Sequence, residues 1–152
     1  MDVYELHYLL AKAKVHEIMK RDVVHVSSDT PIEEAAMILS DRDIGSLPVV
    51  DGSELVGIIS DRDIFRALVD ITGVRHGGYR ICVLVEDRTG SIREVTDIVR
   101  KHGYHLLGIL TSYEKVGEGK RKVVIRAQGE GSFAELRTEL IANYKDIKIR
   151  EG

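Results

Sequence analysis

The sequence is poor in cysteine and in long apolar runs, and both shortages narrow what the protein can be. Cys82 is its single cysteine, so no internal disulfide can form, and its place between Ile81 and Val83 predicts a small buried residue. No apolar run approaches the roughly 20 residues that a membrane-spanning helix needs. The N-terminus also lacks the charged, apolar and small-residue order of a signal peptide. These features predict a cytoplasmic protein with no membrane partner.

Residues suited to catalysis, metal binding or base stacking are also scarce. The histidines fall on different predicted elements, without the spacing of a metal site; they are His7, His16, His25, His76, His102 and His105. No nucleophile-elbow or reactive-cysteine motif is present. Lys120, Arg121 and Lys122 form a basic group at a predicted hairpin tip, but no aromatic platform accompanies them. We therefore expect no enzymatic activity, no required cofactor, no metal site and no nucleic-acid partner.

The 152 residues, of which 43% are hydrophobic and 31% charged, are enough for one domain or two small ones. The charge is uneven. Residues 1–73 carry 7 Lys and Arg against 14 Asp and Glu, whereas residues 74–152 carry 15 against 11. This change from a net charge of -7 to +4 suggests two domains. An acidic first half repels polyanions, so a phosphate bound there needs local donors.

The stretch from Ile44 to Phe65 organises the first half. Two short runs rich in Val and Ile flank Asp51-Gly52, a pair that favours a tight hairpin turn. The second strand ends at Ser60, whose hydroxyl can cap a following helix, with Asp63 completing a capping box. The same corner also suits a nucleotide, because a helix N-terminus and Arg62 attract phosphate while the Asp63 carboxylate can accept from ribose hydroxyls.

The remaining elements follow from periodicity and from start and stop signals. Apolar residues at helical spacing predict an amphipathic helix over residues 2–14. A short helical turn at 15–19 and a brief strand at 24–26 follow, and Thr30 as N-cap before Pro31 predicts a helix that runs to about Ser40. After a glycine-rich boundary we expect βαββαβ, a ferredoxin-like arrangement. Its predicted ranges are 79–86, 91–102, 104–113, 122–127, 132–143 and 146–149, and Gly103 is expected to stop the first of its helices.

The first half resembles a CBS (cystathionine β-synthase) domain in the β-α-β-β-α order. The resemblance rests on Gly45-Ser46-Leu47-Pro48-Val49-Val50-Asp51-Gly52, on Leu55 to Ile64, and on matching residues upstream such as Ile18-Met19 and Thr30-Pro31. It implies an adenosine-containing ligand such as AMP, ATP or S-adenosylmethionine. The nucleotide-binding residues it implies are Met19, Val24, Val26, Ile44, Gly45, Ser46, Ser60, Arg62 and Asp63.

The second half resembles an ACT domain in the stretch from Val83 to Ile92, where a strand ends in an acidic residue and a glycine starts the helix. The resemblance implies dimerisation, or binding of a small effector such as an amino acid at the turn. Tyr104-His105 stands where many ACT domains have a small residue followed by Asn, so assembly alone stays an alternative to effector binding. The implied effector residues are Asp87, Arg88, Thr89, Gly90, Ser91 and Ile92.

A CBS motif followed by an ACT domain resembles the acetoin-utilisation AcuB-type proteins, which normally carry two CBS motifs; the second is the one present here. This predicts an α+β chain with a connector helix (1–14), a CBS motif (15–73), a linker (74–78) and an ACT domain (79–152). We expect that the first CBS motif was either removed from the chain or is supplied by a second copy of it. The expected function is a regulatory module that forms a homodimer or higher oligomer and acts on a target enzyme. An oligomerisation module without ligand is the alternative.

Overall fold

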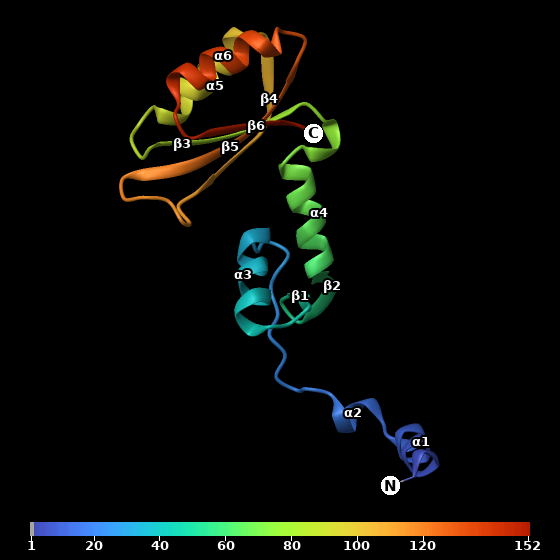
Figure 1. The fold of residues 1–152 in the computed structure, drawn as a ribbon. Helices are drawn as coiled ribbons and strands as arrows, with labels where there is room; N and C mark the ends of the chain where they lie inside the picture. The colour runs from blue at the N-terminus through green and yellow to red at the C-terminus, as the bar shows by residue number, and fades with distance from the viewer. Residues whose placement is uncertain (1) are drawn as a thin grey trace. The chain divides into compact units, whose positions relative to one another are not determined.

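The computed structural model describes residues 2–152, except for the side chains of Leu6, Leu9 and Leu10. The chain divides into two compact units, residues 1–64 and 65–152, with the division inside one helix. The first unit opens with α1 (Val3–Lys12) and the short α2 (Val15–Ile18) (Figure 1). The helix predicted over residues 2–14 is therefore present, while most of its apolar stripe lies outside the described side chains.

The first unit packs one helix against a β-hairpin. The helix is α3 (Ile32–Arg42), and the hairpin consists of β1 (Ser46–Asp51) and β2 (Glu54–Ser60). The helix α4 (Asp61–Ile71) begins directly after β2. Four apolar side chains form the small core, and burying a side chain of this kind contributes about 1.5–3 kcal/mol. They are Val26, Ala35, Leu39 and Leu47.

The hairpin is present, but its turn lies one residue later than expected. Asp51 pairs with Glu54 as the last rung of the ladder, so Gly52 and Ser53 form the two-residue loop. Of these, only Gly52 has a positive φ, 62°. The Asp51 carboxylate accepts hydrogen bonds from the backbone N–H and the hydroxyl of Ser28, at 2.9 and 2.7 Å. These bonds hold Asp51 in the strand and lower the pKa of its carboxyl.

The strand expected at residues 24–26 is reduced to a single bridge. Val26 pairs in parallel with Val49. Its N–H donates to the carbonyl of Pro48 at 3.0 Å, and its carbonyl accepts from the N–H of Val50 at 2.8 Å. The alternation of Val24-His25-Val26 indicated a strand, but Val26 is the one residue of the three that pairs.

The first long helix begins one residue later than the sequence predicts. Thr30 Oγ1 accepts from the backbone N–H of Ser27 at 3.1 Å, so it closes a turn before the helix. Pro31 takes the N-cap position without a side-chain cap, and α3 begins at Ile32. The prediction that Thr30 caps this helix is therefore wrong, because its hydroxyl is used by the preceding turn.

The second unit is a four-stranded antiparallel sheet with two helices, in the predicted βαββαβ order (Figure 1). Its strands lie side by side in the order β4-β5-β3-β6, which is the ferredoxin-like arrangement. The observed elements are β3 (Tyr79–Glu86), α5 (Ser91–Lys101), β4 (Tyr104–Ser112), β5 (Lys120–Gly129), α6 (Phe133–Asn143) and β6 (Ile147–Glu151). The element order and the approximate bounds predicted for this half are confirmed.

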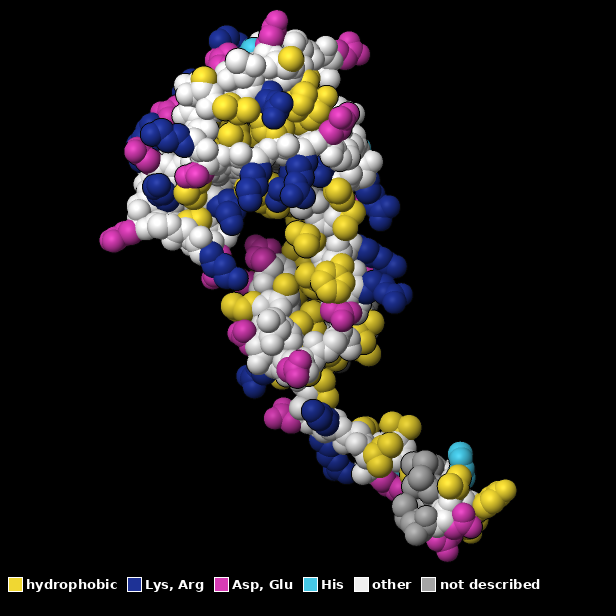
Figure 2. Space-filling model, viewed as in Figure 1, with side chains coloured by type: hydrophobic (Ala, Val, Ile, Leu, Met, Phe, Trp, Pro, Cys, Tyr) yellow, Lys and Arg dark blue, Asp and Glu magenta, His cyan; other side chains and the backbone are white. Residues whose placement is uncertain are grey.

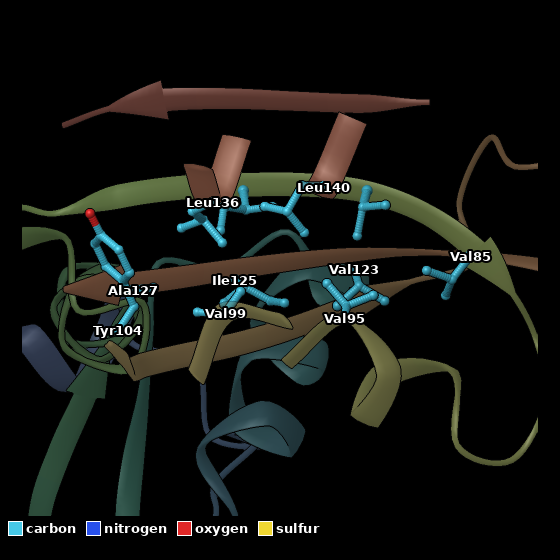
Figure 3. Close-up of a cluster of buried hydrophobic side chains, with 11 residues drawn as sticks. Val85, Val95, Val99, Tyr104, Val123, Ile125, Ala127, Leu136 and Leu140 are labelled. Carbon is cyan, nitrogen blue, oxygen red and sulfur yellow. The ribbon is translucent and has the colours of Figure 1, made fainter. Parts of the chain in front are cut away.

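The core of this unit lies between the sheet and its two helices (Figure 3). Alternate residues of β3 and β5 point into it, as the period of two requires. Fully buried examples are Ile81, Val123 and Ile125, with Leu136 and Leu140 from α6. Cys82 lies on the opposite sheet face and is only partly buried, so the expectation of a buried cysteine is wrong.

Short connections join the elements. A single 3-10 turn, η1 (Val74–His76), lies in the predicted linker. Gly78 follows with a φ of 82°, and a Cβ there would collide with the backbone of Ala127. Gly103 ends α5 with a φ of 81°, as predicted. Of the helices described, none is both long and apolar enough to cross a membrane.

Candidate functional site

The corner between β2 and α4 brings together several of the predicted nucleotide-binding residues. Ser46 and Ser60 face each other as the last pair of the hairpin ladder. Just beyond this pair, the carbonyl of Gly45 accepts from the N–H of Asp61 at 3.1 Å. The ladder therefore continues to the first residue of α4, and it fixes the start of this helix beside the Gly45 backbone. The corner follows from a strand that runs into a helix without a connecting loop.

Asp63 is the most constrained side chain of this corner. Its Oδ2 accepts from the backbone N–H of Ser60 at 3.0 Å and from the Ser60 hydroxyl at 2.6 Å. The Asp63 half of the predicted capping box is therefore present, whereas the Ser60 hydroxyl donates to the carboxylate. The two bonds orient a partly buried carboxylate, so a ribose at this position has to share Oδ2 with Ser60.

The other predicted nucleotide-binding residues differ in exposure. Arg62 and Gly45 are exposed beside Asp63, and Ile44 is partly buried against the small core. Val26 is 7% exposed, so it is a core residue. Met19 and Val24 lie on an irregular segment and are 51% and 38% exposed. The fold thus gathers the polar members and Ile44 around the hairpin, and the binding role of all nine residues stays a prediction.

The predicted effector turn of the second unit is held by arginine. The Arg88 guanidinium donates to both carboxylate oxygens of Glu94 at 2.8 Å, and its Nε donates to Glu86 at 3.2 Å. These carboxylates raise the pKa of Arg88, with Glu94 the larger cause. Gly90 takes the N-cap position of α5 with a φ of 90° and no side-chain cap. Arg88 therefore links Glu86 before the turn to Glu94 after it, and these ion pairs hold the conformation of the turn.

Arg121 belongs to this turn, although sequence reasoning did not include it among the effector residues. Its Nη2 donates to the buried hydroxyl of Ser91 at 3.3 Å, and its Nε lies 3.5 Å from Asp87 Oδ1. That Nε is buried and has no hydrogen-bond partner. Arg121 precedes the inward-facing Val123 and Ile125 by two and four positions on β5. A charge at an inward position of an alternating strand was the signal that could have found it.

A cavity of about 420 Å³ opens beside this turn. Arg88, Ser91 and Glu94 line it from the predicted turn region, and Tyr144 and Lys145 line it from the end of α6. Burial raises the pKa of the Tyr144 hydroxyl, and the nearby Glu94 charge adds to this. The cavity has both carboxylates and cations on its wall. Of the predicted effector residues, Arg88 and Ser91 line it, whereas four others do not, namely Asp87, Thr89, Gly90 and Ile92.

A family model for the CBS domain matches residues 15–70. The chain carries a CBS domain. The matched range contains the β2–α4 corner and the whole hairpin, and it extends past the boundary between the two compact units at residue 64. CBS domains are in general regulatory modules that bind ligands, so the corner described above lies in a domain of that kind. Residues 71–152 lie outside this match.

The chain is similar to parts of several proteins that carry different names. The uncharacterized protein MJ1225 of Methanocaldococcus jannaschii is 23% identical over 97% of this chain. Inosine-5'-monophosphate dehydrogenase of Thermoplasma acidophilum is 30% identical over 68%, and homoserine O-acetyltransferase of Methanosalsum zhilinae is 44% identical over 43%. The chain spans 55%, 23% and 13% of these proteins, respectively. The likeness therefore covers only part of each relative.

In the part of the chain that the structure describes, no group of three or more His, Cys, Asp or Glu side chains is arranged to hold a metal ion. His102 is partly buried and contacts Glu139 at 2.8 Å, whereas His16 is exposed beside Glu17. These histidine contacts are with carboxylates on the helices of their own unit.

Proposed function

We propose that the chain is a cytoplasmic regulatory module without enzymatic activity, which senses an adenosine-containing nucleotide through its CBS domain. The observation that carries this proposal is the β2–α4 corner. There, a partly buried Asp63 carboxylate is oriented by Ser60 at the start of a helix. Arg62 is exposed on the same first turn. These residues match the polar needs of a ribose and a phosphate.

Each part of a nucleotide has a chemically suited group at the corner. The ribose hydroxyls would donate to the Asp63 carboxylate, whose Oδ2 is already oriented by Ser60. The phosphates would lie near the N-terminus of α4 and the Arg62 guanidinium, because both favour negative charge. The adenine would pack near Ile44 at the edge of the small apolar core. Residues 1–73 carry a net charge of -7, which repels an anionic ligand. The attraction for the phosphates therefore has to come from a local cation, Arg62.

The exposed apolar surface of the CBS domain supports a paired arrangement. Leu55 and Ile58 on β2 are 67% and 68% exposed, and Met37 on α3 is 56% exposed. Exposed apolar groups of this kind are typical of interfaces. We propose that a CBS motif of a second copy covers this surface in a homodimer or higher oligomer. Nucleotide binding would then favour one dimer geometry and so act on a target enzyme.

We further propose that the second unit is an ACT domain, which would make the chain similar to the acetoin-utilisation AcuB-type proteins. Its βαββαβ order and the turn at residues 87–92 support this proposal. The cavity beside the turn has Glu86 and Glu94 on its wall together with Arg88 and Lys145. Charges of both signs suit the two charged ends of an amino acid. Dimerisation without an effector is the other use of the unit.

Calorimetric titration of AMP, ATP and S-adenosylmethionine into the full chain tests the nucleotide proposal. We expect saturable binding of at least one ligand, and an affinity about 10- to 100-fold weaker in Asp63→Ala, because hydrogen bonds to charged groups contribute about 1.5–3 kcal/mol. Asp70→Ala is the matched control, since Asp70 is an exposed carboxylate on the same helix. It should bind like the unchanged protein.

Two further results separate the possible explanations. Arg62→Gln should weaken ATP more than adenosine, because only ATP presents phosphates to the guanidinium. If the folded protein gives no heat with any of the three ligands, the nucleotide proposal fails. Asp63 is then a helix cap, and an oligomerisation module without ligand becomes the better explanation. The exposed apolar side chains of β2 favour that second candidate.

A further inference from the structure

The sheet of the second unit has one face that α5 and α6 do not cover, and this open face is strongly basic. The end of α4 approaches it at Gly108, where a Cβ would lie 2.7 Å from the Ile71 carbonyl oxygen. Residues that alternate with the core positions point to it. Of the strand residues on this face, only Glu86 is acidic, and it lies at the end of β3 opposite Lys120. The cations are Arg80, Lys120, Lys122, Arg126, Lys148 and Arg150. Figure 2 shows Lys and Arg side chains gathered along the sheet side of this unit.

Three of these cations stand in one row across three strands. Arg80 on β3 is directly opposite Arg126 on β5 and directly opposite Arg150 on β6. Like charges in direct cross-strand register destabilise a sheet. Within the described residues, the side chains of Arg80 and Arg150 form no hydrogen bond or ion pair. The row therefore carries an unbalanced repulsion that a bound anion would relieve.

A small cavity lies between two members of the row. It measures about 130 Å³ and is lined by Thr72, Arg80, Gly108, Leu110, Val124 and Arg126. Arg126 is only 8% exposed, and its Nη1 donates to the Gly77 carbonyl at 3.0 Å, which holds the guanidinium in place. The cavity is below the roughly 300 Å³ at which sites for drug-sized ligands begin. It suits a compact anionic group.

We propose that this open face binds a phosphate group in the cavity between Arg80 and Arg126, with Arg150 completing the row of cations. Arginine is the side chain best suited to phosphate, because its planar guanidinium can donate two parallel hydrogen bonds to phosphate oxygens. Gly108 lines the cavity, and its lack of a side chain lets the backbone of Ile71 and Thr72 approach the sheet there. The site lies on the sheet face opposite the helices and is independent of the nucleotide proposed for the CBS domain.

Calorimetric titration of inorganic phosphate into the full chain, at constant ionic strength set with chloride, tests the site. We expect saturable binding that is weakened about tenfold in Arg80→Gln, because that substitution removes one charge-assisted pair. Arg137→Gln is the matched control, since Arg137 is exposed on α6 and its loss changes the net charge equally. The control should bind like the unchanged protein. Equal weakening in both variants, or no saturable heat, overturns the proposal.

Thermal unfolding gives a second readout that does not depend on heats of binding. In phosphate-free buffer, Arg80→Gln should raise Tm by roughly 1–4 °C, because it removes a repulsive pair from each side of β3. Phosphate should raise the Tm of the unchanged protein but not that of the variant. An Arg80→Gln variant that is stabilised by phosphate as much as the unchanged protein refutes the site. Arg126→Gln is avoided here because Arg126 is buried and the variant could misfold.

Two further probes identify the source of the phosphate group. Glycerol 3-phosphate represents a phosphomonoester. If it binds more tightly than inorganic phosphate, the natural ligand of the site is a phosphate ester. Equal or weaker binding assigns it to the free ion. Heparin tests for a long polyanion. Strong retention on heparin without saturable phosphate binding overturns the phosphate site in favour of a polyanion surface, whose affinity falls steeply with salt.

Discussion

Glu139 connects the two helices of the second unit through charge. Its carboxylate accepts from Lys101 Nζ at 2.9 Å and lies 2.8 Å from His102 Nε2. The hydrogen bond from Lys101, followed by that from His102, holds the pKa of Glu139 below its ordinary value of 4.5. A lowered carboxyl pKa stabilises the folded state above the unfolded-state value, and this stabilisation is lost as the pH falls through the folded-state value.

We therefore expect Glu139→Gln to be less stable than the unchanged protein at pH 7, and the difference to shrink below about pH 4.5, where the unfolded carboxyl becomes protonated. Urea unfolding followed by circular dichroism at pH 7 and pH 3 measures it. Glu135→Gln on the same helix is the control, since the Glu135 side chain is exposed, and it should show no pH-dependent difference. An effect of equal size at both pH values would contradict this explanation.

At the scale of the elements, a glycine of β4, Gly108, allows this strand to lie against the end of α4. A Cβ on Gly108 would lie 2.7 Å from the carbonyl oxygen of Ile71. We expect Gly108→Ala to lower the free energy of unfolding by about 1–3 kcal/mol, which is the usual cost of overpacking. Gly117→Ala is the control, because no atom lies within 4 Å of that Cβ. Chemical denaturation compares the two variants, and equal stability would disprove the close contact.

The elements of the second unit were predictable from the sequence because its strands alternate and its helices have clear stop signals. Tyr79–Glu86 was predicted without error, and Gly103 was correctly identified as the end of a helix. The first unit was harder, because Val26 forms a single bridge and Thr30 serves a turn. The Thr30 contact with Ser27 is local, but the Val26 bridge depends on which backbone group from far along the chain lies nearby. Local spacing contains no information about that.

The candidate sites show the same limit. The corner at Ser60 and Asp63 is local in sequence, so a capping pattern was enough to find it. Arg121 reaches the turn at Asp87 only through the pairing of β3 with β5. The arginine row likewise needs the registers of three strands. Contacts between strands far apart in the chain were the part that the sequence did not reveal.

For the whole molecule, the exposed apolar side chains of β2 predict self-association. Ile58 is 68% exposed at the centre of that strand. We expect Ile58→Asp to shift the protein toward the monomer, because a buried unpaired carboxylate opposes interface formation. Ile141→Asp is the control, since Ile141 is 50% exposed on α6. Light scattering after size-exclusion chromatography measures the mass. A monomer for the unchanged protein, or the same oligomer for both variants, would reject the expected interface.

The hairpin of the first unit also bears on how long the protein survives in a cell. Its sheet has only two strands, so, within the described residues, the outer edge of β2 has backbone groups that no neighbouring strand pairs. An apolar strand with an open edge is a template for misassembly. A chain that has not yet met its partner would be subject to chaperones and proteases, which act on exposed apolar segments. Copies that have not paired with a second copy should then be degraded first.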